Sequence, residues 1–355
     1  MLTRAGAKRL TIRAISAQPP RNLGASVPSS PRPVVPPPPA LPGGEIELRP
    51  YGDFIDWLAA SRGTLAVSTY NSGKVALLSA RGATLSANVW KLPRPMGLAI
   101  QDDLLAIAAR HHVLVYELTA NCPADLAQCR LKAAYHTGRL DAHDLAFDSQ
   151  GLLFANTRFN CAARPSDRVH FARTWQPWFV ARSVRRDSCH LNGIGVRDGR
   201  LAMATAFCQC GVPAGWRTAE RFTSGILIDV QGEQIAVNGL NMPHSPRWHE
   251  SRWWFCNSGE GAVCTFAPGR AGVEEVAALA GFTRGLTFAH GRAAVGLSRI
   301  RRRHILDAPP VRQRWPALRA GVAIIDPASG AETGGVEFVR GGREVYDVAF
   351  IPERP

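Results

Sequence analysis

The stretch His143-Asp144-Leu145-Ala146-Phe147 is one copy of a five-residue motif that recurs through the chain and decides its fold. The first two positions change from copy to copy, whereas the remaining three are mostly small or apolar. Counted at the second residue, consecutive copies are 47, 49, 52, 40 and 62 residues apart. A repeat of roughly 40–50 residues made of strand-like pieces is typical of a β-propeller with one blade per repeat. The other five copies begin at Met96, Asn192, His244, Arg284 and Tyr346.

Short apolar runs separated by turn residues follow the copies of this repeat motif. Runs 104–109 and 113–118, for example, flank His111-His112. Short alternating runs bounded by Gly, Asn, Asp and Ser favour strands over helices. We therefore expect blades of four strands, with the repeat motif as the innermost strand. The long segments 158–187, 213–221 and 300–320 are expected to form loops at the rim.

The two ends of the repeat region complement each other. The last motif begins at Tyr346, only nine residues before Pro355, so the other strands of its blade are missing. The block 64–92 contains predicted strands, but no motif precedes it. Pairing the C-terminal strand with this block completes a sixth blade and protects two exposed sheet edges. The prediction is an all-β, six-bladed propeller closed by its C-terminal strand.

A proline-rich segment precedes the propeller. It contains Pro19-Pro20 and the run Pro36 to Pro39, followed by Pro42-Gly43-Gly44. Each proline lacks a backbone donor and has a fixed φ, so we expect residues 1–45 to stay out of the sheets. Polyproline II or disorder is the expected state of this tail, and residues 46–355 are the expected propeller. The tail is interpreted as an appendage, with a proline-recognising protein partner as the alternative.

The composition indicates which partners to expect. Lys and Arg number 42 against 28 Asp and Glu, giving a net charge of +14 and a pI near 10.1. The excess is mostly arginine scattered through predicted loops, without the repeated basic–aromatic spacing of single-strand nucleic-acid binders. We therefore expect the partner to be a small anionic molecule and not a nucleic acid.

The sequence also predicts a location. It has no apolar run long enough for a transmembrane helix, and residues 1–18 lack the apolar core of a secretory signal, so no membrane association is expected. The eight cysteines permit disulfides, but a long chain without a signal segment is interpreted as reduced and cytoplasmic.

Two sets of positions carry polar residues that a propeller brings to one face: the starts of the innermost strands and the loops between second and third strands. Loops converging on one axis would form a concave polar site. The candidate catalytic residues are His143, His190, His244 and Asp144. The candidate substrate-binding residues are Arg284, Asn156, Arg158, Asn192, Asn257, Tyr70 and Tyr346.

Three of these candidates are histidines in three consecutive repeats. Neutral imidazoles together with a carboxylate suit a divalent transition metal, which could act as a Lewis acid or activate water. The predicted ligands are His143, His190 and His244, with Glu344 and Asp347 as oxygen donors. Two alternatives stay open: the histidines hydrogen-bond substrate directly, or they stabilise the ends of the strands. His143 and His244 begin their motifs whereas His190 lies two residues before one, and this offset weakens the metal interpretation.

Several motifs together resemble a known family. They include His136-Thr137-Gly138, Cys189-His190-Leu191-Asn192-Gly193, Met242-Pro243-His244-Ser245-Pro246-Arg247-Trp248 and Phe282-Thr283-Arg284-Gly285-Leu286. The chain resembles the uncharacterised bacterial DUF4915 proteins from about Trp57 to Pro355. It departs from the family pattern at Asn160-Cys161 and at Cys208 and Cys210. The family has no established reaction, so the resemblance implies no activity.

The functional hypothesis therefore rests on the candidate site residues and not on the family resemblance. The signatures Gly-x-Ser-x-Gly, Gly-x-Gly-x-x-Gly, the P-loop and His-Glu-x-x-His are absent, which argues against serine hydrolases of the elbow type and dedicated nucleotide folds. We expect an enzyme acting on a small polar or anionic molecule at the channel face, by metal-assisted hydrolysis or lyase chemistry. The alternative is a non-catalytic scaffold that binds a peptide or protein through the same face.

Overall fold

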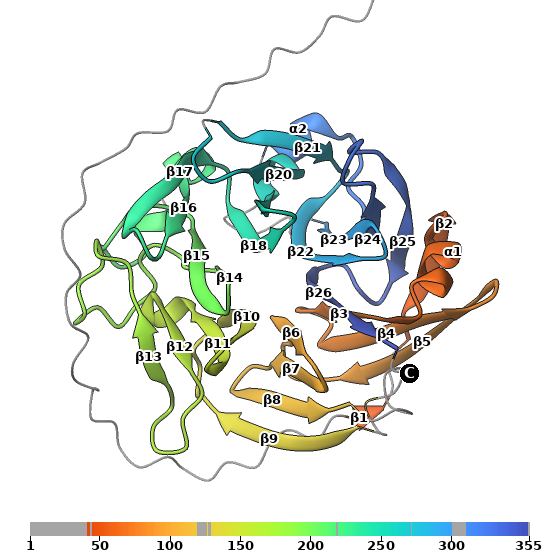
Figure 1. The fold of residues 1–355 in the computed structure, drawn as a ribbon, viewed down its shortest axis with the longest axis horizontal. Helices are drawn as coiled ribbons and strands as arrows, with labels where there is room; N and C mark the ends of the chain where they lie inside the picture. Colours follow the sequence, from red (N-terminus) through yellow and green to blue (C-terminus); the bar gives the residue numbers. More distant parts are fainter. Residues whose placement is uncertain are drawn as a thin grey trace, which may run out of the picture.

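Six antiparallel sheets surround a central axis in the computed structural model (Figure 1). The structure describes residues 41–42, 45–118, 126, 129–217, 219–270, 272–299 and 310–353. In each sheet the strand that carries the repeat motif is innermost, as predicted. The six innermost strands are β6 (Leu98–Gln101), β10 (Ala142–Asp148), β14 (Gly193–Arg197), β18 (Pro243–His249), β22 (Phe282–Ala289) and β26 (Val345–Pro352).

The first blade joins the two ends of the propeller and confirms the predicted closure. The C-terminal strand β26 pairs with β3 (Gly63–Thr69), which is followed outward by β4 (Lys74–Arg81) and β5 (Thr84–Lys91). One expectation is wrong here, because β1 (Leu41–Pro42) pairs with the outer edge of β5. Proline is tolerated on an edge strand, where its missing donor faces no neighbour. The rest of the predicted tail, residues 1–40 and 43–44, lies outside the described residues.

The next four blades have four strands each. Segment 158–187 supplies the two outer strands of one of them, so the prediction of a rim loop there is wrong. The strands outside each innermost strand are β7 (Leu104–Ala108), β8 (His112–Glu117) and β9 (Arg130–His136); β11 (Gly151–Asn156), β12 (Cys161–Arg164) and β13 (Ala172–Trp175); β15 (Arg200–Ala206), β16 (Gly225–Asp229) and β17 (Gln234–Leu240); and β19 (Arg252–Asn257), β20 (Ala262–Phe266) and β21 (Glu274–Ala278).

The sixth blade carries an addition that the sequence analysis missed. Outside β22 lie β23 (Arg292–Ser298), β24 (Gly321–Ile325) and β25 (Glu332–Arg340), and β2 (Glu47–Gly52) pairs with β25 as a fifth strand. The helix α1 (Phe54–Ala60) follows and packs on the same region, burying Phe54, Trp57 and Leu58. Their i, i+3, i+4 spacing is the helical pattern that could have predicted this element.

The loops between the second and third strands of several blades contain short helical turns. Their bounds are η2 (Thr157–Phe159), η3 (Gly215–Arg217), η4 (Ala219–Phe222), η5 (Ser258–Glu260) and α2 (Val311–Arg314).

Strand alternation explains how the blades hold together. In β3, Ala66 packs in one apolar cluster with Leu105 of the next blade, whereas Leu65 and Val67 pack in another with Val336 of the preceding blade. Successive side chains of a strand point to opposite faces, so each buried strand contributes to two interfaces.

The second position of the repeat motif links neighbouring blades around the axis. Asp144 accepts a hydrogen bond from the Ile194 amide (3.0 Å), and Asp347 accepts one from the Leu98 amide (2.8 Å). Ser245 accepts one from the Gly285 amide (2.9 Å). The side chains of Asp144, Ser245 and Asp347 thus each bind the backbone of the next innermost strand.

The three intervening copies of the motif have glycine at this position. A Cβ on Gly97 would lie 2.8 Å from Cα of Asp144, and one on Gly285 would lie 2.6 Å from the Val348 amide nitrogen. Around the axis, the second position of the motif therefore alternates between glycine and a residue with a polar side chain. Asp144 and Asp347, predicted as catalytic and metal-binding residues, lie in this inter-blade contact.

The cysteines differ from the expectation of a fully reduced chain. Cys129 is disulfide-bonded, and its partner lies outside the described residues. The prediction of eight reduced cysteines is therefore wrong. Cys161, Cys189, Cys208, Cys210, Cys256 and Cys264 are free thiols. Within the described ranges, we find no helix long and apolar enough to cross a bilayer.

Candidate functional site

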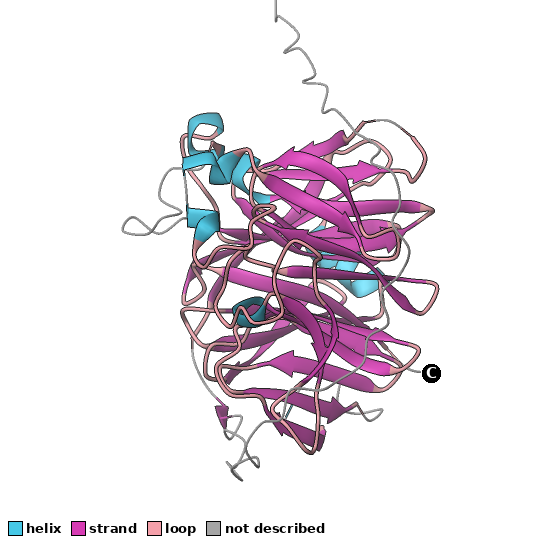
Figure 2. Ribbon diagram, turned by 90° about the vertical axis from the view of Figure 1, so that its left-hand side faces the viewer, coloured by secondary structure: helices cyan, strands magenta, loops and turns pink. Residues whose placement is uncertain are grey.

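The candidate site lies on the face where the innermost strands begin, which we call the channel face. The loops between second and third strands reach the same face, because Thr157 of η2 contacts His143 at the start of β10. Ser258 of η5 likewise contacts His244 of β18. Figure 2 shows short helices gathered along one side of the disc, as the loop positions of η3, η4 and α2 require.

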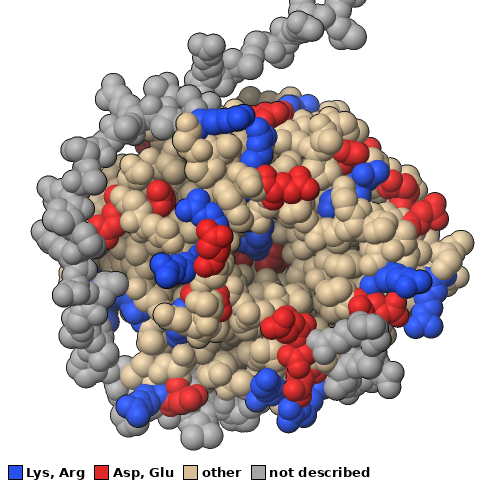
Figure 3. All heavy atoms as spheres, viewed as in Figure 1, with Lys and Arg blue, Asp and Glu red and all other residues tan. Residues whose placement is uncertain are grey.

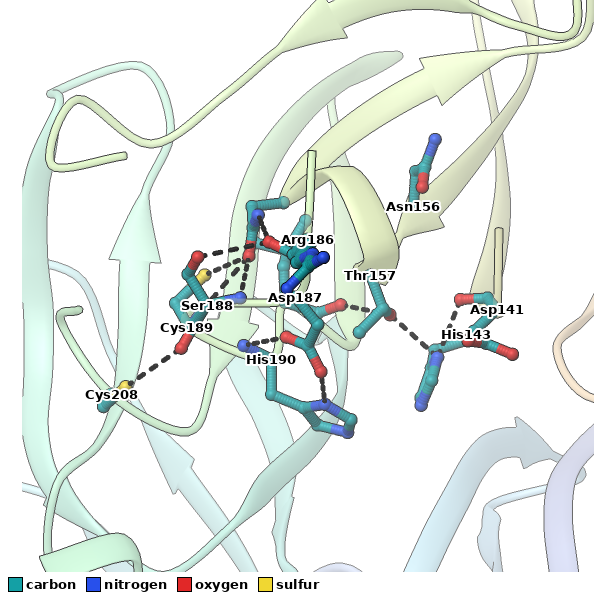
Figure 4. A network of polar contacts seen from close by, with 12 residues as sticks. Asp141, His143, Asn156, Thr157, Arg186, Asp187, Ser188, Cys189, His190 and Cys208 are labelled. Atoms are coloured by element: carbon teal, nitrogen blue, oxygen red, sulfur yellow. Dashed lines mark hydrogen bonds and ion pairs between the residues drawn. The ribbon is translucent and has the colours of Figure 1, made fainter. Parts of the chain in front are cut away.

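Two of the predicted histidines are anchored in the same way. Nδ1 of His143 lies 2.8 Å from the Asp141 carbonyl oxygen and 2.7 Å from Oγ1 of Thr157 (Figure 4). Nδ1 of His244 lies 2.9 Å from the Met242 carbonyl oxygen and 2.8 Å from Oγ of Ser258. A carbonyl oxygen can only accept, so Nδ1 carries the proton in both rings and Nε2 carries a lone pair.

Burial keeps these two imidazoles neutral. The pKa of His143 is well below its usual value because of burial, the nearby His190 and Arg284. The pKa of His244 is lowered in the same way by burial, then by Arg284, His190 and His143. Nε2 of His244 is buried and has no hydrogen-bond partner in the described structure. Both rings therefore offer the site a hydrogen-bond acceptor.

His190 has a different partner. Its Nδ1 lies 2.7 Å from Oδ2 of Asp187, and its backbone amide donates to Oδ1 of the same carboxylate at 2.9 Å (Figure 4). The ring also packs against Phe207 and Trp216, with centroids 4.5 and 4.3 Å away. Asp187 therefore fixes the ring orientation and can stabilise an imidazolium, leaving Nε2 for a ligand. The sequence analysis missed Asp187, although it precedes His190 by only three residues.

Arg284 supplies the positive charge of the site. Its guanidinium carbon lies 3.4 Å from the centre of the Tyr346 ring, and it has no ion pair or hydrogen bond with any described residue. No salt bridge joins the Arg284 guanidinium to the Asp347 carboxylate in the described structure. Tyr346 in turn contacts the ring of Tyr70 at 5.5 Å, and Arg94 lies 5.5 Å from the Tyr70 ring.

These contacts form a series around the axis that we call the aromatic–histidine ring. Tyr346 lies 5.6 Å from His143, which lies 4.9 Å from His190, measured between ring centroids. Beyond His190 and Phe207, the series passes through His244 to Phe282, which lies two residues before Arg284. The full series is Arg284, Tyr346, His143, His190, Phe207, His244 and Phe282, contributed by five of the six blades. The predicted histidines and Arg284 therefore do come together.

A buried charge cluster lies among the innermost strands. The Arg247 guanidinium binds Asp144 through two contacts of 3.0 Å, and its Nη2 atom lies 3.8 Å from Oδ1 of Asp347. Burial raises the pKa of Asp347 to about 7, although Arg247 lowers it. Asp144 and Asp347 therefore bind Arg247 and backbone amides, and the catalytic role of Asp144 and the metal-binding role of Asp347 stay predictions.

The other predicted site residues are placed by the fold as follows. Asn156 caps η2 through the Phe159 amide, and Asn192 accepts from Thr205. Asn257 accepts from the Asn241 amide. Their oxygens are therefore used within the loops. Arg158 is exposed, and Glu344 is half-buried at the start of β26.

The predicted metal site is not assembled as a ligand set. Among the described residues, no group of three or more His, Cys, Asp or Glu side chains has the geometry to hold a metal ion. The Nδ1 anchoring of all three histidines is nonetheless the arrangement that metal-binding imidazoles adopt. Metal binding therefore stays a prediction.

Ion-paired arginines lie on both faces, and further arginines on the channel face have no ion pair with a described residue. On the opposite face and the flanks, arginines form ion pairs, such as Arg164 with Asp148 at 2.6 Å and Arg292 with Asp326 at 3.2 Å. Figure 3 views that opposite face, where basic and acidic side chains are interspersed around a central hollow. The loops of the channel face hold arginines without an ion pair to any described residue: Arg94, Arg110, Arg139, Arg158, Arg182, Arg185, Arg186, Arg217 and Arg343.

The fold and the site define a six-bladed β-propeller with a basic, histidine-lined channel face. Among solved structures, the nidogen/laminin complex contains a chain with a TM-score of 0.53 and 12% identity, covering 82% of this chain and 99% of that one. A protein of unknown function from Bacteroides caccae gives 0.53 and 9% with the same coverages. Identities this low show the shared fold alone.

The sequence itself matches a family over residues 52–355, described as a domain of unknown function, DUF4915. The chain belongs to this DUF4915 family, as its motifs predict. No curated protein matches the sequence.

Proposed function

We propose that this protein is an enzyme that binds a small anionic molecule at the channel face and acts on it by acid–base chemistry. The observation that carries the proposal is the Arg284 guanidinium, which lies close to the imidazoles of His143 and His244 and has no ion-pair partner among the described residues. A guanidinium presents a planar fork of donors that fits a carboxylate or phosphate.

His190 is the proposed acid–base group. A general base needs a free nitrogen and a partner that stabilises its charged form, and the 2.7 Å contact with Asp187 supplies that partner. His143 and His244 bind carbonyl oxygens through Nδ1 and have no carboxylate partner. In hydrolysis, Nε2 of His190 would take a proton from water as the oxygen attacks, and would return it to the leaving group. In a lyase reaction it would take the proton from carbon.

The anion-binding part of the proposal is tested by calorimetry with inorganic phosphate and oxalate. We expect Arg284→Gln to weaken binding at least about tenfold, because a charge-assisted hydrogen bond contributes about 1.5–3 kcal/mol. Arg200→Gln is the matched control, since this arginine is exposed at the start of β15 on the opposite face and has no ion pair with a described residue, and it should change affinity less than about twofold. Equal effects of the two variants would refute a specific site at Arg284.

The acid–base part is tested by the reactivity of His190. Diethyl pyrocarbonate modifies unprotonated, accessible imidazole nitrogens, and mass spectrometry locates the modified ring. We expect His190 to react fastest of the three histidines and Asp187→Asn to shift the pH dependence of its modification. If Asp187→Asn leaves that pH profile unchanged, the proposed pair does not function as a unit.

A metal-assisted reaction is the second candidate, favoured by the shared Nδ1 anchoring of His143, His190 and His244. Elemental analysis of purified wild-type protein beside folded His143→Ala and His244→Ala variants tests it. Stoichiometric metal that both variants lose would establish this candidate. Wild-type protein that takes up no divalent ion would remove it.

A further inference from the structure

We infer that the anion recognised at Arg284 carries hydroxyl groups, as a hydroxy acid, a sugar acid or a sugar phosphate does. This inference rests on the proposed function and specifies its substrate class. It is based on the polar groups of the aromatic–histidine ring that have no hydrogen-bond partner in the described structure.

The two neutral histidines can only accept at their open nitrogen. Nδ1 of His143 and of His244 donates to a backbone carbonyl, so Nε2 in each ring is a lone pair. His244 is 2% exposed and its Nε2 has no partner among the described residues. A buried acceptor without a donor costs free energy, so a ligand that supplies an O–H or N–H group is favoured over one that does not. Simple carboxylates and the dianions of phosphate monoesters supply no such donor.

A third unsatisfied group points to the same chemistry. The hydroxyl of Tyr346 is 5% exposed as part of its residue and has no hydrogen-bond partner among the described residues. The Tyr346 ring lies directly against Arg284, at 3.4 Å, and 5.6 Å from His143. A phenol both donates and accepts, as an alcohol does. One hydroxyl-bearing molecule could therefore satisfy Tyr346 and a histidine while its anionic group binds Arg284.

The walls of the site fit the carbon face of such a molecule. Phe207 and Phe282 pack edge-on against His244 at 5.3 and 5.6 Å, and Trp216 packs on His190 at 4.3 Å. Aromatic walls provide apolar contact area, while a few fixed polar groups set the orientation of a ligand. A polyhydroxylated chain or ring has C–H groups for these walls and O–H groups for the acceptors.

The test compares ligands that differ only in hydroxyl groups. Gluconate is measured against hexanoate, and glycerol 3-phosphate against propyl phosphate, by calorimetry on the full chain. We expect the hydroxylated member of at least one pair to bind about tenfold or more tightly to the wild type, a factor that corresponds to one satisfied acceptor. His244→Phe keeps a ring but removes the acceptor, and should reduce this preference to less than about threefold. His143→Phe serves the same purpose if His244→Phe melts early.

The outcomes separate this inference from the proposed function. If both members of each pair bind equally and Arg284→Gln weakens both, the anion site stands and the hydroxylated substrate class is refuted. If none of the four ligands, phosphate or oxalate binds, the proposed function itself is refuted. A preference that survives in both phenylalanine variants would also overturn the inference, because the histidine acceptors would then not be its cause.

Discussion

Replacing Arg247 by methionine tests how the buried charges hold the propeller together. In the wild type, Arg247 lies between two carboxylates, with two 3.0 Å contacts to Asp144 and one of 3.8 Å to Asp347. The side chains of Asp144 and Asp347 are only 4% and 3% exposed. Removing one partner of a buried ion pair typically costs about 3–5 kcal/mol, because an uncompensated charge remains. We expect Arg247→Met to lose about that much stability at pH 8.

The loss should depend on pH in a defined direction. Without the cation, the pKa of Asp347 in the folded state rises further above that of the unfolded chain. The folded variant then retains protons that the unfolded chain releases, so its stability falls as pH rises through this window. The deficit relative to the wild type should therefore be smaller at pH 5 than at pH 8.

The assay is urea unfolding at both pH values, followed by the fluorescence of the nine tryptophans. The matched control is Arg292→Met, which removes the partly exposed 3.2 Å pair with Asp326 and should cost less than about 1 kcal/mol. A loss below about 1 kcal/mol for Arg247→Met, or one of the same size at both pH values, would refute this account of the cluster.

Three further outcomes are expected. Gly285→Ala should lower the free energy of unfolding in urea by at least about 3 kcal/mol, because φ is +80° and the new Cβ would meet the next innermost strand. The control Gly291→Ala, at φ +68° with open space around it, should cost only about 1–2 kcal/mol. Similar costs for the two variants would contradict the close approach of the backbones at Gly285. The pKa of Asp347 is raised to about 7, so its contribution to stability is present below about pH 4 and lost as pH rises through 7; Asp347→Asn should flatten the melting-temperature profile between pH 4 and 8, and an unchanged slope would count against it. If the unpaired arginines steer anions, the association rate of phosphate in stopped flow should fall several-fold between 20 and 300 mM salt. The double charge reversal Arg182→Glu with Arg185→Glu should weaken this salt dependence. A salt-independent rate would exclude steering.

The sequence by itself determined the architecture. The repeat motif gave the number of blades and its own place as the innermost strand, and the isolated copy at Tyr346 gave the closure with β3. These features can be predicted from the sequence because strand alternation and repeat spacing are local properties of the chain. The helix α1 was equally legible in the spacing of Phe54, Trp57 and Leu58, and was missed only because the repeat pattern begins after it.

Candidate residues could be found in the sequence, but their roles could not. His143, His190, His244 and Arg284 all begin or precede innermost strands, and the common geometry of the blades brings them to one axis. Asp144 begins its strand beside His143, yet it binds Arg247, which is 103 residues away, and an amide of the next blade. No pattern within one repeat distinguishes such a carboxylate from a catalytic one.

Only the tertiary structure decided which polar groups are left for a ligand. Asp187 lies next to His190 in space and in sequence, but its contact with Nδ1 depends on a loop whose conformation is set by Asn160, which binds the Ser188 and Cys189 amides at 2.8 and 3.2 Å. Arg247, and not Arg284, forms the ion pairs with Asp144 and Asp347. A hydrogen-bonding group is free or occupied according to its neighbours from other blades, and those neighbours exist only in the folded chain.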